Sequence, residues 1–349
     1  MVNDYAGYTA KKKLIILLLF GTTLIMGVYA ISTGSSGLTM GKVVSTLLGQ
    51  GDPAAKAVIL NIRLPRILAG LLAGAGLSVA GCVMQNTLRN PLASPFTLGI
   101  SQAAAFGAAL AIVTLGAGKV QNSIADAVLI NNPYLVTTSA FAWAMIATLV
   151  ILLLAKFRGI TPEAMVLAGV ALGSLFGAGT TIVQYFAPDV QVAAVVFWTF
   201  GDLGRASWNE VIIMTVVVSL SIAYFLMRRW DYNALDSGEE SALGLGVNVD
   251  RIRLGGMFIA SLITAVLVSF LGIIGFIGLV GPHMMRRIIG GDHRYLIPAS
   301  VLAGSLLLLI SDTLARTIMA PVVLPVGAIT AFMGAPLFLY LLARGYQKK

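Results

Sequence analysis

The chain has 349 residues, of which 58% are apolar and only 11% are charged, and its mean hydropathy is +0.92. A water-soluble domain carries about 25% charged residues, so this composition excludes a water-soluble protein and indicates a bilayer protein. The net charge of +9 does not indicate nucleic-acid binding, because Lys and Arg stand in small groups between apolar runs. The single cysteine, Cys82, excludes an intrachain disulfide and is expected to be a buried packing residue.

Ten apolar stretches approach the length of a membrane-spanning helix, about 20 residues. In lipid, backbone polar groups must be satisfied within their own segment, and no stretch alternates like the strands of an outer-membrane barrel. We therefore predict an all-α polytopic membrane protein, with residues 1–349 in a single transmembrane domain. The predicted helices are 14–33, 64–86, 95–116, 134–155, 163–187, 208–228, 254–273, 274–290, 296–311 and 326–343.

The first stretch follows Lys11-Lys12-Lys13, as in a signal peptide, but it is long enough to span the bilayer, so we expect an uncleaved helix. An inside N-terminus and ten spans put 16 of the 23 Lys and Arg residues inside and 7 outside. The positive-inside rule then predicts a multi-pass protein of the cytoplasmic (inner) membrane with both termini in the cytoplasm.

Glycines recur at intervals of four residues on two predicted helices, at Gly70 and Gly74 and at Gly169, Gly173 and Gly177. This spacing leaves one helix face bare enough for close backbone contact in a membrane. It predicts a packed bundle and says nothing of what the bundle does.

Motifs of catalysis and of ATP binding are missing from the sequence. It contains no G-x-x-x-x-G-K-[ST] loop, and its only histidines, His283 and His293, form no H-E-x-x-H pair. We therefore expect a non-catalytic chain that binds no metal or cofactor, and we disfavour an intramembrane enzyme. A stand-alone secondary transporter stays as an alternative. It is disfavoured because most of the 14 acidic residues fall in loops or at helix ends instead of mid-span.

Polar and helix-breaking residues gather at the end of the second predicted helix. A broken helix at this depth is tolerated only beside protein or water. The cluster is therefore either part of a permeation path or a capped helix end with a turn. Its members are Gln85, Asn86, Arg89, Asn90, Pro91 and Pro95.

Three of the four arginines on the predicted outer side, against the usual charge bias, stand near a span end beside Pro65 or Asp312. Arg63 and Arg66 flank Pro65 at the start of the second helix, and Arg316 follows Asp312 at the end of the ninth. They can receive an acidic partner that docks from outside. Alternatively, they pair within the chain, for which Asp312 is available, or extend to lipid phosphates.

The longest predicted inside loop, 229–253, contains the only clustered acidic residues. Within it, Ser237-x-x-Glu240 predicts a capping box that starts a short helix, and Gly244 or Gly246 predicts its end. Such a helix would display Leu243 and Leu245 as a docking element, unless the segment is only a solvated connection. On the other side, residues 117–133 form a predicted outer loop.

Several blocks of the sequence together resemble the FecCD-type ABC transporter permease family, which imports iron siderophores, haem and cobalamin. The resemblance covers nearly the whole chain in order. The blocks are Arg63-Leu-Pro-Arg66-Ile-Leu-Ala-Gly, Gly81-x-x-x-Gln85-x-x-x-Arg89-Asn90-Pro91-Leu92-Ala93-x-Pro95-x-x-Leu98-Gly99, Leu167-Ala-Gly-Val-Ala-Leu-Gly173, Leu243-Gly-Leu-Gly-Val247 and Gly275-Phe-Ile-Gly-Leu-Val-Gly-Pro282-His283-x-x-Arg286.

The resemblance implies a type II ABC importer permease bundle of ten spans that forms a homodimer with the pore at the dimer interface. Two copies of a separate P-loop ATPase, which uses ATP and Mg, would dock on the cytoplasmic side at residues 231–247. An extracytoplasmic substrate-binding protein would dock on Arg63, Arg66 and Arg316. The implied ATPase-coupling residues are Ser237, Glu239, Glu240, Leu243, Gly244, Leu245 and Gly246.

The same resemblance implies a cytoplasmic gate, with Asn90 and Leu92 in one part and Thr161, Pro162 and Glu163 in the other. Family members often carry small hydroxyl residues at the second part, so Pro162 and Glu163 depart from the pattern. His283 is interpreted as a structural residue of a Gly-Pro-His turn.

The implied activity is ATP-driven import by alternating access, with ligand bound weakly enough to be released. The family's commonest cargo favours an iron chelate, a siderophore or haem, and leaves cobalamin or molybdate as alternatives. Residue patterns do not distinguish these substrates.

Overall fold

The computed structural model describes residues 2–34, 40–120, 128–130, 132–159 and 161–346. Part of the predicted outer loop 117–133 and the terminal Lys348 and Lys349 lie outside the described residues. The described part is largely helical, which confirms the all-α prediction. Its only strands are β1 (Gly118–Val120) and β2 (Val128–Ile130), which pair antiparallel within that outer loop.

Ten long helices correspond one to one with the ten predicted stretches. Among the described residues, seven of these helices are long and apolar enough to cross a membrane, α5 and α15 are shorter apolar helices, and the tenth, α13, has 13 residues and belongs to neither group. The ten are α1 (Val2–Ser32), α4 (Leu64–Thr87), α5 (Ile100–Val113), α6 (Pro133–Arg158), α7 (Pro162–Tyr185), α9 (Trp208–Met227), α12 (Val249–Leu271), α13 (Ile277–Ile289), α14 (His293–Thr317) and α15 (Val326–Tyr346).

Shorter helices connect these ten helices, and most of them were not predicted from the sequence. They are α2 (Met40–Leu47), α3 (Pro53–Val58), α8 (Asp189–Thr199), α10 (Arg229–Asp236) and α11 (Glu239–Gly244). A π-helical turn, Ile59–Arg63, joins α3 to α4, so that one apolar helical run extends from Pro53 to Thr87. A single 3-10 turn, Leu203–Arg205, precedes α9.

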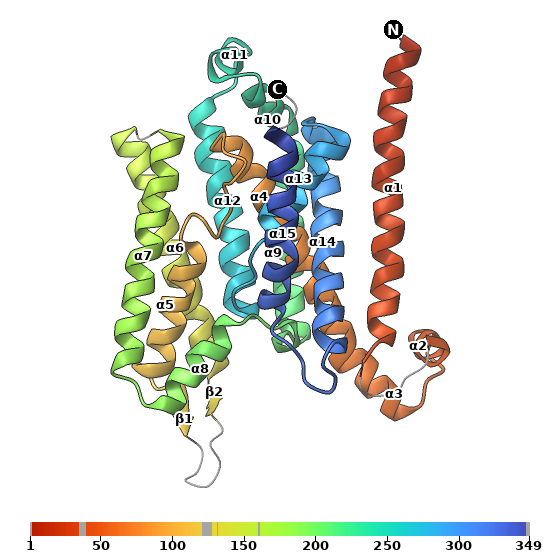
Figure 1. The fold of residues 1–349 in the computed structure, drawn as a ribbon, viewed down its shortest axis with the longest axis vertical. Helices are drawn as coiled ribbons and strands as arrows, with labels where there is room; N and C mark the ends of the chain where they lie inside the picture. Colours follow the sequence, from red (N-terminus) through yellow and green to blue (C-terminus); the bar gives the residue numbers. More distant parts are fainter. Residues whose placement is uncertain (1, 35–39, 121–127, 131, 160, 347–349) are drawn as a thin grey trace.

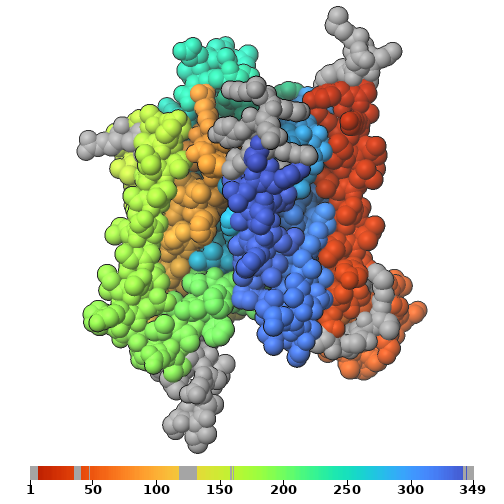
Figure 2. Space-filling model, in the orientation of Figure 1, coloured from red at the N-terminus to blue at the C-terminus, as the bar shows by residue number. Residues whose placement is uncertain are grey.

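The two ends of the bundle carry different connections (Figure 1). α10 and α11 lie at the same end as the start of α1 and the end of α15, whereas α2, α3, α8 and the β1–β2 pair lie at the other end. This arrangement agrees with an even number of spans. In Figure 2, α7 and α15 lie on the molecular surface and α1 forms the opposite flank from α7.

The core is built around α4, which packs against α12, α13 and α14. Its backbone approaches two neighbours so closely that only glycine fits. A Cβ at Gly74 would lie 2.3 Å from the carbonyl oxygen of Gly304, and one at Gly81 would lie 1.7 Å from that of Gly278. Small residues thus set the distance between helices, as expected where apolar burial alone does not drive association.

Only part of the predicted glycine face of α7 packs against a neighbouring segment of the described chain. A Cβ at Gly169 would lie 2.6 Å from Leu98 Cα, and Gly173 contacts Gly99, so both pack against the start of α5. By contrast, a Cβ at Gly177 would have no heavy atom of a neighbouring described segment within 4 Å. The spacing therefore predicted the packing of two of the three glycines.

Candidate functional site

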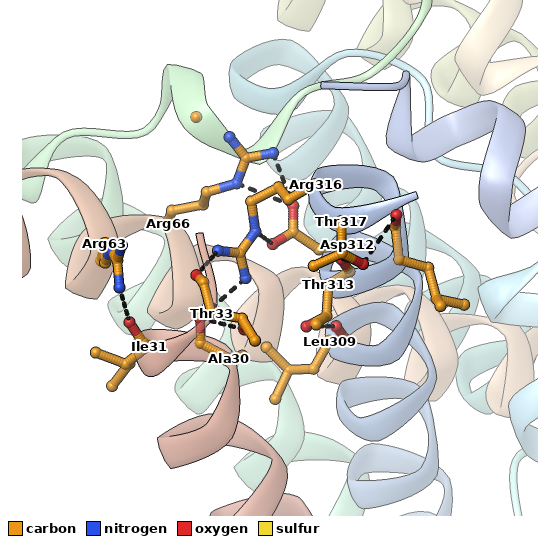
Figure 3. Close-up of polar contacts among 12 residues, drawn as sticks. Ala30, Ile31, Thr33, Arg63, Arg66, Leu309, Asp312, Thr313, Arg316 and Thr317 are labelled. Carbon is orange, nitrogen blue, oxygen red and sulfur yellow. Dashed lines mark hydrogen bonds and ion pairs between the residues drawn. The ribbon is translucent and has the colours of Figure 1, made fainter. Parts of the chain in front are cut away.

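One candidate site is a cluster of four charged residues, Arg63, Arg66, Asp312 and Arg316, which we call the arginine cluster (Figure 3). Arg66 on α4 donates from Nε and Nη2 to Oδ1 of Asp312, at 2.9 and 2.8 Å. Arg316, one turn along α14, donates from Nε to the other oxygen, Oδ2, at 2.9 Å. Asp312 is fully buried, so one carboxylate joins two guanidinium groups by charge-assisted hydrogen bonds.

The remaining donors of the arginine cluster hold the end of α1. Arg63 donates to the carbonyl oxygens of Ile31 and Ser32, and Arg316 donates to those of Ala30 and Thr33. The last carbonyls of a helix have no intrahelical donors and carry partial negative charge, so cations are favourable there. The intramolecular pairing considered from sequence is therefore present, and it involves both Arg66 and Arg316.

All three arginine side chains are largely buried, and that of Arg66 is the least so. Arg63 is buried, and the side chain of Arg316 is nearly so. Arg66 also faces Asp202, whose carboxylate lies 3.4 Å from Nη2 and is about half exposed. The structure thus brings the three predicted docking residues together, but it commits most of their donors to partners within the chain. Their docking role stays a prediction.

A second candidate site is the segment formed by α10 and α11. The predicted capping box at Ser237 is wrong, because Gly238 is the residue that precedes α11 and it makes no side-chain cap. The physical reason is that α10 continues to Asp236, which makes Ser237 its last cap; the Ser237 hydroxyl donates back to the Asn233 carbonyl. Gly238, at φ 114°, then turns the chain from one helix into the next.

The predicted end of this short helix is confirmed. α11 ends at Gly244, and Gly246 adopts φ 81° two residues later. The side chains of Leu243 and Leu245 are 61% and 72% exposed. Two neighbouring exposed leucines at the end of the bundle are available to a partner surface.

The acidic residues of α11 have different surroundings. Glu239 pairs with Arg253 at the start of α12 and lies 3.8 Å from Arg89, which follows α4. α11 is thereby tied to both neighbouring spans, whereas Glu240 is exposed. The predicted coupling residues therefore occupy one continuous surface segment.

The predicted gate residues fall in two capped turns. Asn90 Oδ1 accepts from the backbone N–H of Leu92 at 2.9 Å, which closes the turn after α4. Thr161 Oγ1 accepts from Ala164 N–H at 3.3 Å and so caps α7, with Pro162 and Glu163 in its first turn. Proline and an acidic residue both suit a helix start, which explains locally why they stand there.

Within the described chain, no hydrogen bond joins Thr161, Pro162 or Glu163 to Asn90 or Leu92. The helix-breaking residues at the end of α4 make a capped turn, which is one of the two alternatives for this cluster. Leu92 also lines a cavity, which agrees with the other alternative, part of a permeation path. Gate function stays a prediction for both turns.

That cavity has a volume of about 530 Å³ and is mostly apolar. It lies between the turn after α4, the segment between α12 and α13, and α15. Phe276 immediately precedes α13. At φ 64° it adopts a left-handed conformation that is uncommon for an aromatic residue. The bulky residues of the lining are Leu92, Phe96, Phe200, Ile273, Phe276, Leu279 and Phe338.

Sequence reasoning missed most of this lining. The only available signal was the Gly272–Gly275 interruption between the seventh and eighth predicted helices, which the structure shows as a non-helical segment from Gly272 to Phe276. Phe200 and Phe338 come from distant parts of the chain, and nothing in their local sequence distinguishes them from lipid-facing aromatics.

The predicted Gly-Pro-His turn is wrong, because His283 lies inside α13. Pro282 is accommodated within that helix. It has no N–H to offer the carbonyl of Gly278 four residues earlier, and Gln85 Nε2 donates to this carbonyl at 3.4 Å. The His283 ring packs against Phe338, 5.7 Å between centroids, beside the apolar cavity.

Comparisons with known proteins agree with this architecture. The chain belongs to the FecCD transport family, whose model matches residues 22–344. It is 56% identical to a Methanocaldococcus jannaschii protein provisionally named an ABC transporter permease, over 99% of both chains. It is 38% identical to the Fe(3+)-citrate import system permease protein YfmE of Bacillus subtilis, over 96% of this chain and 97% of the relative.

A solved structure is also similar along the full length. It is described as an inward-facing conformation of a transporter provisionally assigned to the metal-chelate ABC type. It shares 29% identity, covers 95% of this chain and 99% of its own, and superimposes with a TM-score of 0.82. The chain is therefore the permease component of an ABC importer, in agreement with the helical bundle and the missing catalytic motifs.

Proposed function

We propose that this chain is the membrane-spanning permease subunit of an ATP-driven importer for an iron chelate, a siderophore or haem, or a related metal complex. The observation that carries the proposal is the placement of two groups of residues at opposite ends of one bundle. The exposed leucines of α10–α11 lie at one end, and the arginine cluster lies at the other.

In this proposal the permease works as a homodimer with two P-loop ATPase subunits and an extracytoplasmic substrate-binding protein. ATP and Mg are used by the ATPase, and this chain binds no cofactor. Ser237, Glu239, Glu240 and residues 243–246 form the ATPase contact. Arg66, next to the half-exposed Asp202, is the arginine of its cluster best placed to meet the binding protein.

The bundle sits in the cytoplasmic membrane with both termini and α10–α11 on the cytoplasmic side. The charge count supports this orientation, since 16 of 23 basic residues belong to that end. Arg66 and Arg316, at the other end, are exceptions to the positive-inside rule. Hydrogen bonds with Asp312 and with the end of α1 stabilise their charges there.

Transport proceeds by alternating access at the dimer interface. ATP binding shifts the equilibrium between outward-open and inward-open states only through contacts that differ between them. The turns at Asn90–Leu92 and Thr161–Glu163 form the cytoplasmic gate. The mostly apolar cavity of about 530 Å³ beside Leu92 forms part of the path.

The cargo is a bulky metal complex. A path lined by Leu92, Phe276 and Phe338 suits a large ligand with apolar surface better than a small hydrated ion. Curated relatives are named for Fe(3+)-citrate, hemin and cobalamin at 36–38% identity, which supports the class and leaves cobalamin as an alternative to an iron chelate. Molybdate, the other alternative, is a small oxyanion and suits this apolar path less well.

The test is co-purification of the chain in detergent with a P-loop ATPase encoded beside it, followed by ATPase and uptake assays in liposomes. We expect a complex of two permeases and two ATPases whose activity rises with the binding protein. A chain that purifies alone and transports solute by coupling to an ion gradient would instead be a secondary transporter.

Replacing both Leu243 and Leu245 with Asp sharpens this test. Burial of a leucine stabilises an interface by about 1.5–3 kcal/mol, so the double variant should release the ATPase from the membrane. Leu115→Asp, an exposed leucine after α5 at the other end, is the matched control and should retain it. Full retention by the α11 variant would assign ATPase docking to another segment.

A further inference from the structure

A group of polar side chains lies beneath α10, where the connecting segment meets the spanning helices. We call it the α10 cluster; it comprises Asn86 on α4, Asn233 and Asp236 on α10, Arg286 on α13 and His293 on α14. Asn233 and Asp236 are one turn apart, so they lie on one face of α10. This face meets three spanning helices at once.

Asp236 is the residue on which the cluster converges. Its Oδ1 accepts from Asn86 Nδ2 at 2.7 Å, and the same amide donates to the backbone carbonyl of Tyr232 at 3.0 Å. Its Oδ2 lies 3.5 Å from His293 Nδ1 and 3.9 Å from Arg286 Nη1. The contact to α4 is a good hydrogen bond, whereas those to α13 and α14 are longer than one.

Asn233 completes the attachment of α10 to α14. Its Oδ1 accepts from the backbone N–H of His293 at 2.8 Å and lies 3.0 Å from the ring Nδ1. Its Nδ2 donates to Asp292 Oδ1 at 3.0 Å. These contacts fasten one part of the α10 face firmly to the start of α14, whereas Asp236 is held firmly only to α4 and loosely toward α13 and α14.

The cluster is incompletely satisfied in this conformation. Among the described residues, buried polar atoms without a hydrogen-bond partner include Asn86 Oδ1, Arg286 Nη2 and His293 Nε2. A buried polar group without a partner is costly. Beside Asn86 and Arg286 lies a cavity of about 430 Å³, whose lining includes Arg89 and Asp236. There is thus room for Asp236 and Arg286 to approach each other and form a close ion pair.

We propose that Asp236 is the positioning residue that transmits movement of the α10–α11 segment to α4 and α13, by holding Asn86 in this conformation and closing on Arg286 in another. The inference rests on the proposed function, in which α10–α11 meets the ATPase. Because a contact that is equal in two states cannot shift their populations, the coupling must come from one that changes, and the Asp236–Arg286 pair is long enough to change.

The experiment measures substrate transported per ATP hydrolysed in liposomes for the wild-type complex and for Asp236→Asn. Asparagine keeps the volume and the acceptor for Asn86 but removes the charge that faces Arg286. Coupling between sites typically changes an equilibrium by about 5–150-fold, so we expect transport per ATP to fall about tenfold with ATPase co-purification unchanged. Asp250→Asn, a well-exposed carboxylate at the start of α12, is the matched control.

Arg286→Gln tests the same contact from the other side. If the pair acts as a unit, Arg286→Gln and the double variant should lose about as much coupling as Asp236→Asn alone. Losses that multiply, or an unchanged transport-to-ATP ratio in Asp236→Asn, overturn the inference while leaving the proposed function intact. A parallel fall in thermal midpoint and complex yield would mark Asp236 as merely structural and also overturn it.

The result for the wild-type chain distinguishes a failure of the proposed function from a failure of this inference. A wild-type chain that binds no ATPase overturns the proposed function and this inference with it. A wild-type complex that couples normally, with Asp236→Asn coupling equally well, overturns the inference alone.

Discussion

Two carboxylates at opposite ends of the bundle are built in different ways. Asp312 is fully buried and accepts three charge-assisted hydrogen bonds from Arg66 and Arg316. Asp236 is about one-third exposed and accepts one hydrogen bond from Asn86; its nearest cation, Arg286, lies at 3.9 Å, and the ring Nδ1 of His293 lies at 3.5 Å. The first site is closed and holds helices in one arrangement; the second is loose and can change partners. Rigidity and movement are thus assigned to different ends of the same chain.

The largest expected effect comes from breaking the closed site. Asp312→Asn would leave two largely buried guanidinium groups without their counter-charge. Removing one partner of a buried ion pair typically costs about 3–5 kcal/mol. We expect a large drop in the thermal unfolding midpoint in detergent.

Asp202→Asn is the control for that variant, because its half-exposed carboxylate also faces Arg66. Exposed ion pairs contribute about 0–1 kcal/mol, so its midpoint should change little. Equal midpoints for Asp312→Asn and the wild type would show that the arginine cluster does not hold the helices together.

A second prediction concerns Asp292, which caps α14 beside the α10 cluster. Burial works to raise the pKa of Asp292, but hydrogen bonds from Arg294 and Asn233 outweigh it and lower the pKa to about 2. Since the pKa is depressed on folding, the stabilisation is present above the unfolded value of about 3.9 and is lost as pH falls toward 2. It amounts to about 2 kcal/mol.

The measurement compares unfolding midpoints of the wild type and Asp292→Asn across pH. We expect the wild type to be more stable above about pH 5 and the two to converge near pH 2. Comparing the two proteins cancels the titration of other carboxylates. A difference that is constant over the whole range would show that the charge of Asp292 contributes nothing.

Sequence reasoning predicted the parts of this fold that lipid dictates. Ten apolar stretches became helices because a spanning segment must satisfy its own backbone. Gly244 and Gly246 marked the end of α11 because the chain reverses there through a left-handed glycine. Both signals are local, and both were confirmed.

The signals that failed depend on distant residues or on a neighbouring helix. Ser237 resembles a helix start, but the preceding α10 makes it a helix end. Asp312 was foreseen as a partner of Arg316, four residues away, yet its pairing with Arg66 spans 246 positions. The Asn86–Asp236 contact spans 150. No periodicity or motif places such residues together, so the α10 cluster could be found only in three dimensions.

A third effect, local to the end of α1, separates anchoring from docking at Arg63. Replacing Arg63 with Met removes its hydrogen bonds to the carbonyls of Ile31 and Ser32. The loss of a hydrogen bond from a charged donor lowers stability by about 1.5–3 kcal/mol. We expect faster amide exchange near residues 29–34, while Lys42→Met, an exposed change nearby, leaves exchange unaltered. Unchanged exchange with loss of stimulation by the binding protein would favour a docking role.

The smallest expected effect on stability is that of Asp236→Asn, and it tests the comparison directly. Burial raises the pKa of Asp236, with Arg286 and Asn86 acting only partly against it. A carboxyl group whose pKa rises on folding is less favourably ionised in the folded chain than in the unfolded one, so removing its charge should cost little. We expect the unfolding midpoint to stay within the range of ordinary surface changes, about 0.5 kcal/mol. Asparagine therefore separates the two sites: at Asp312 it should destabilise the fold, and at Asp236 it should leave the fold intact. A strong destabilisation by Asp236→Asn would show that both carboxylates are structural and that the loose geometry at α10 does not reflect a capacity to move.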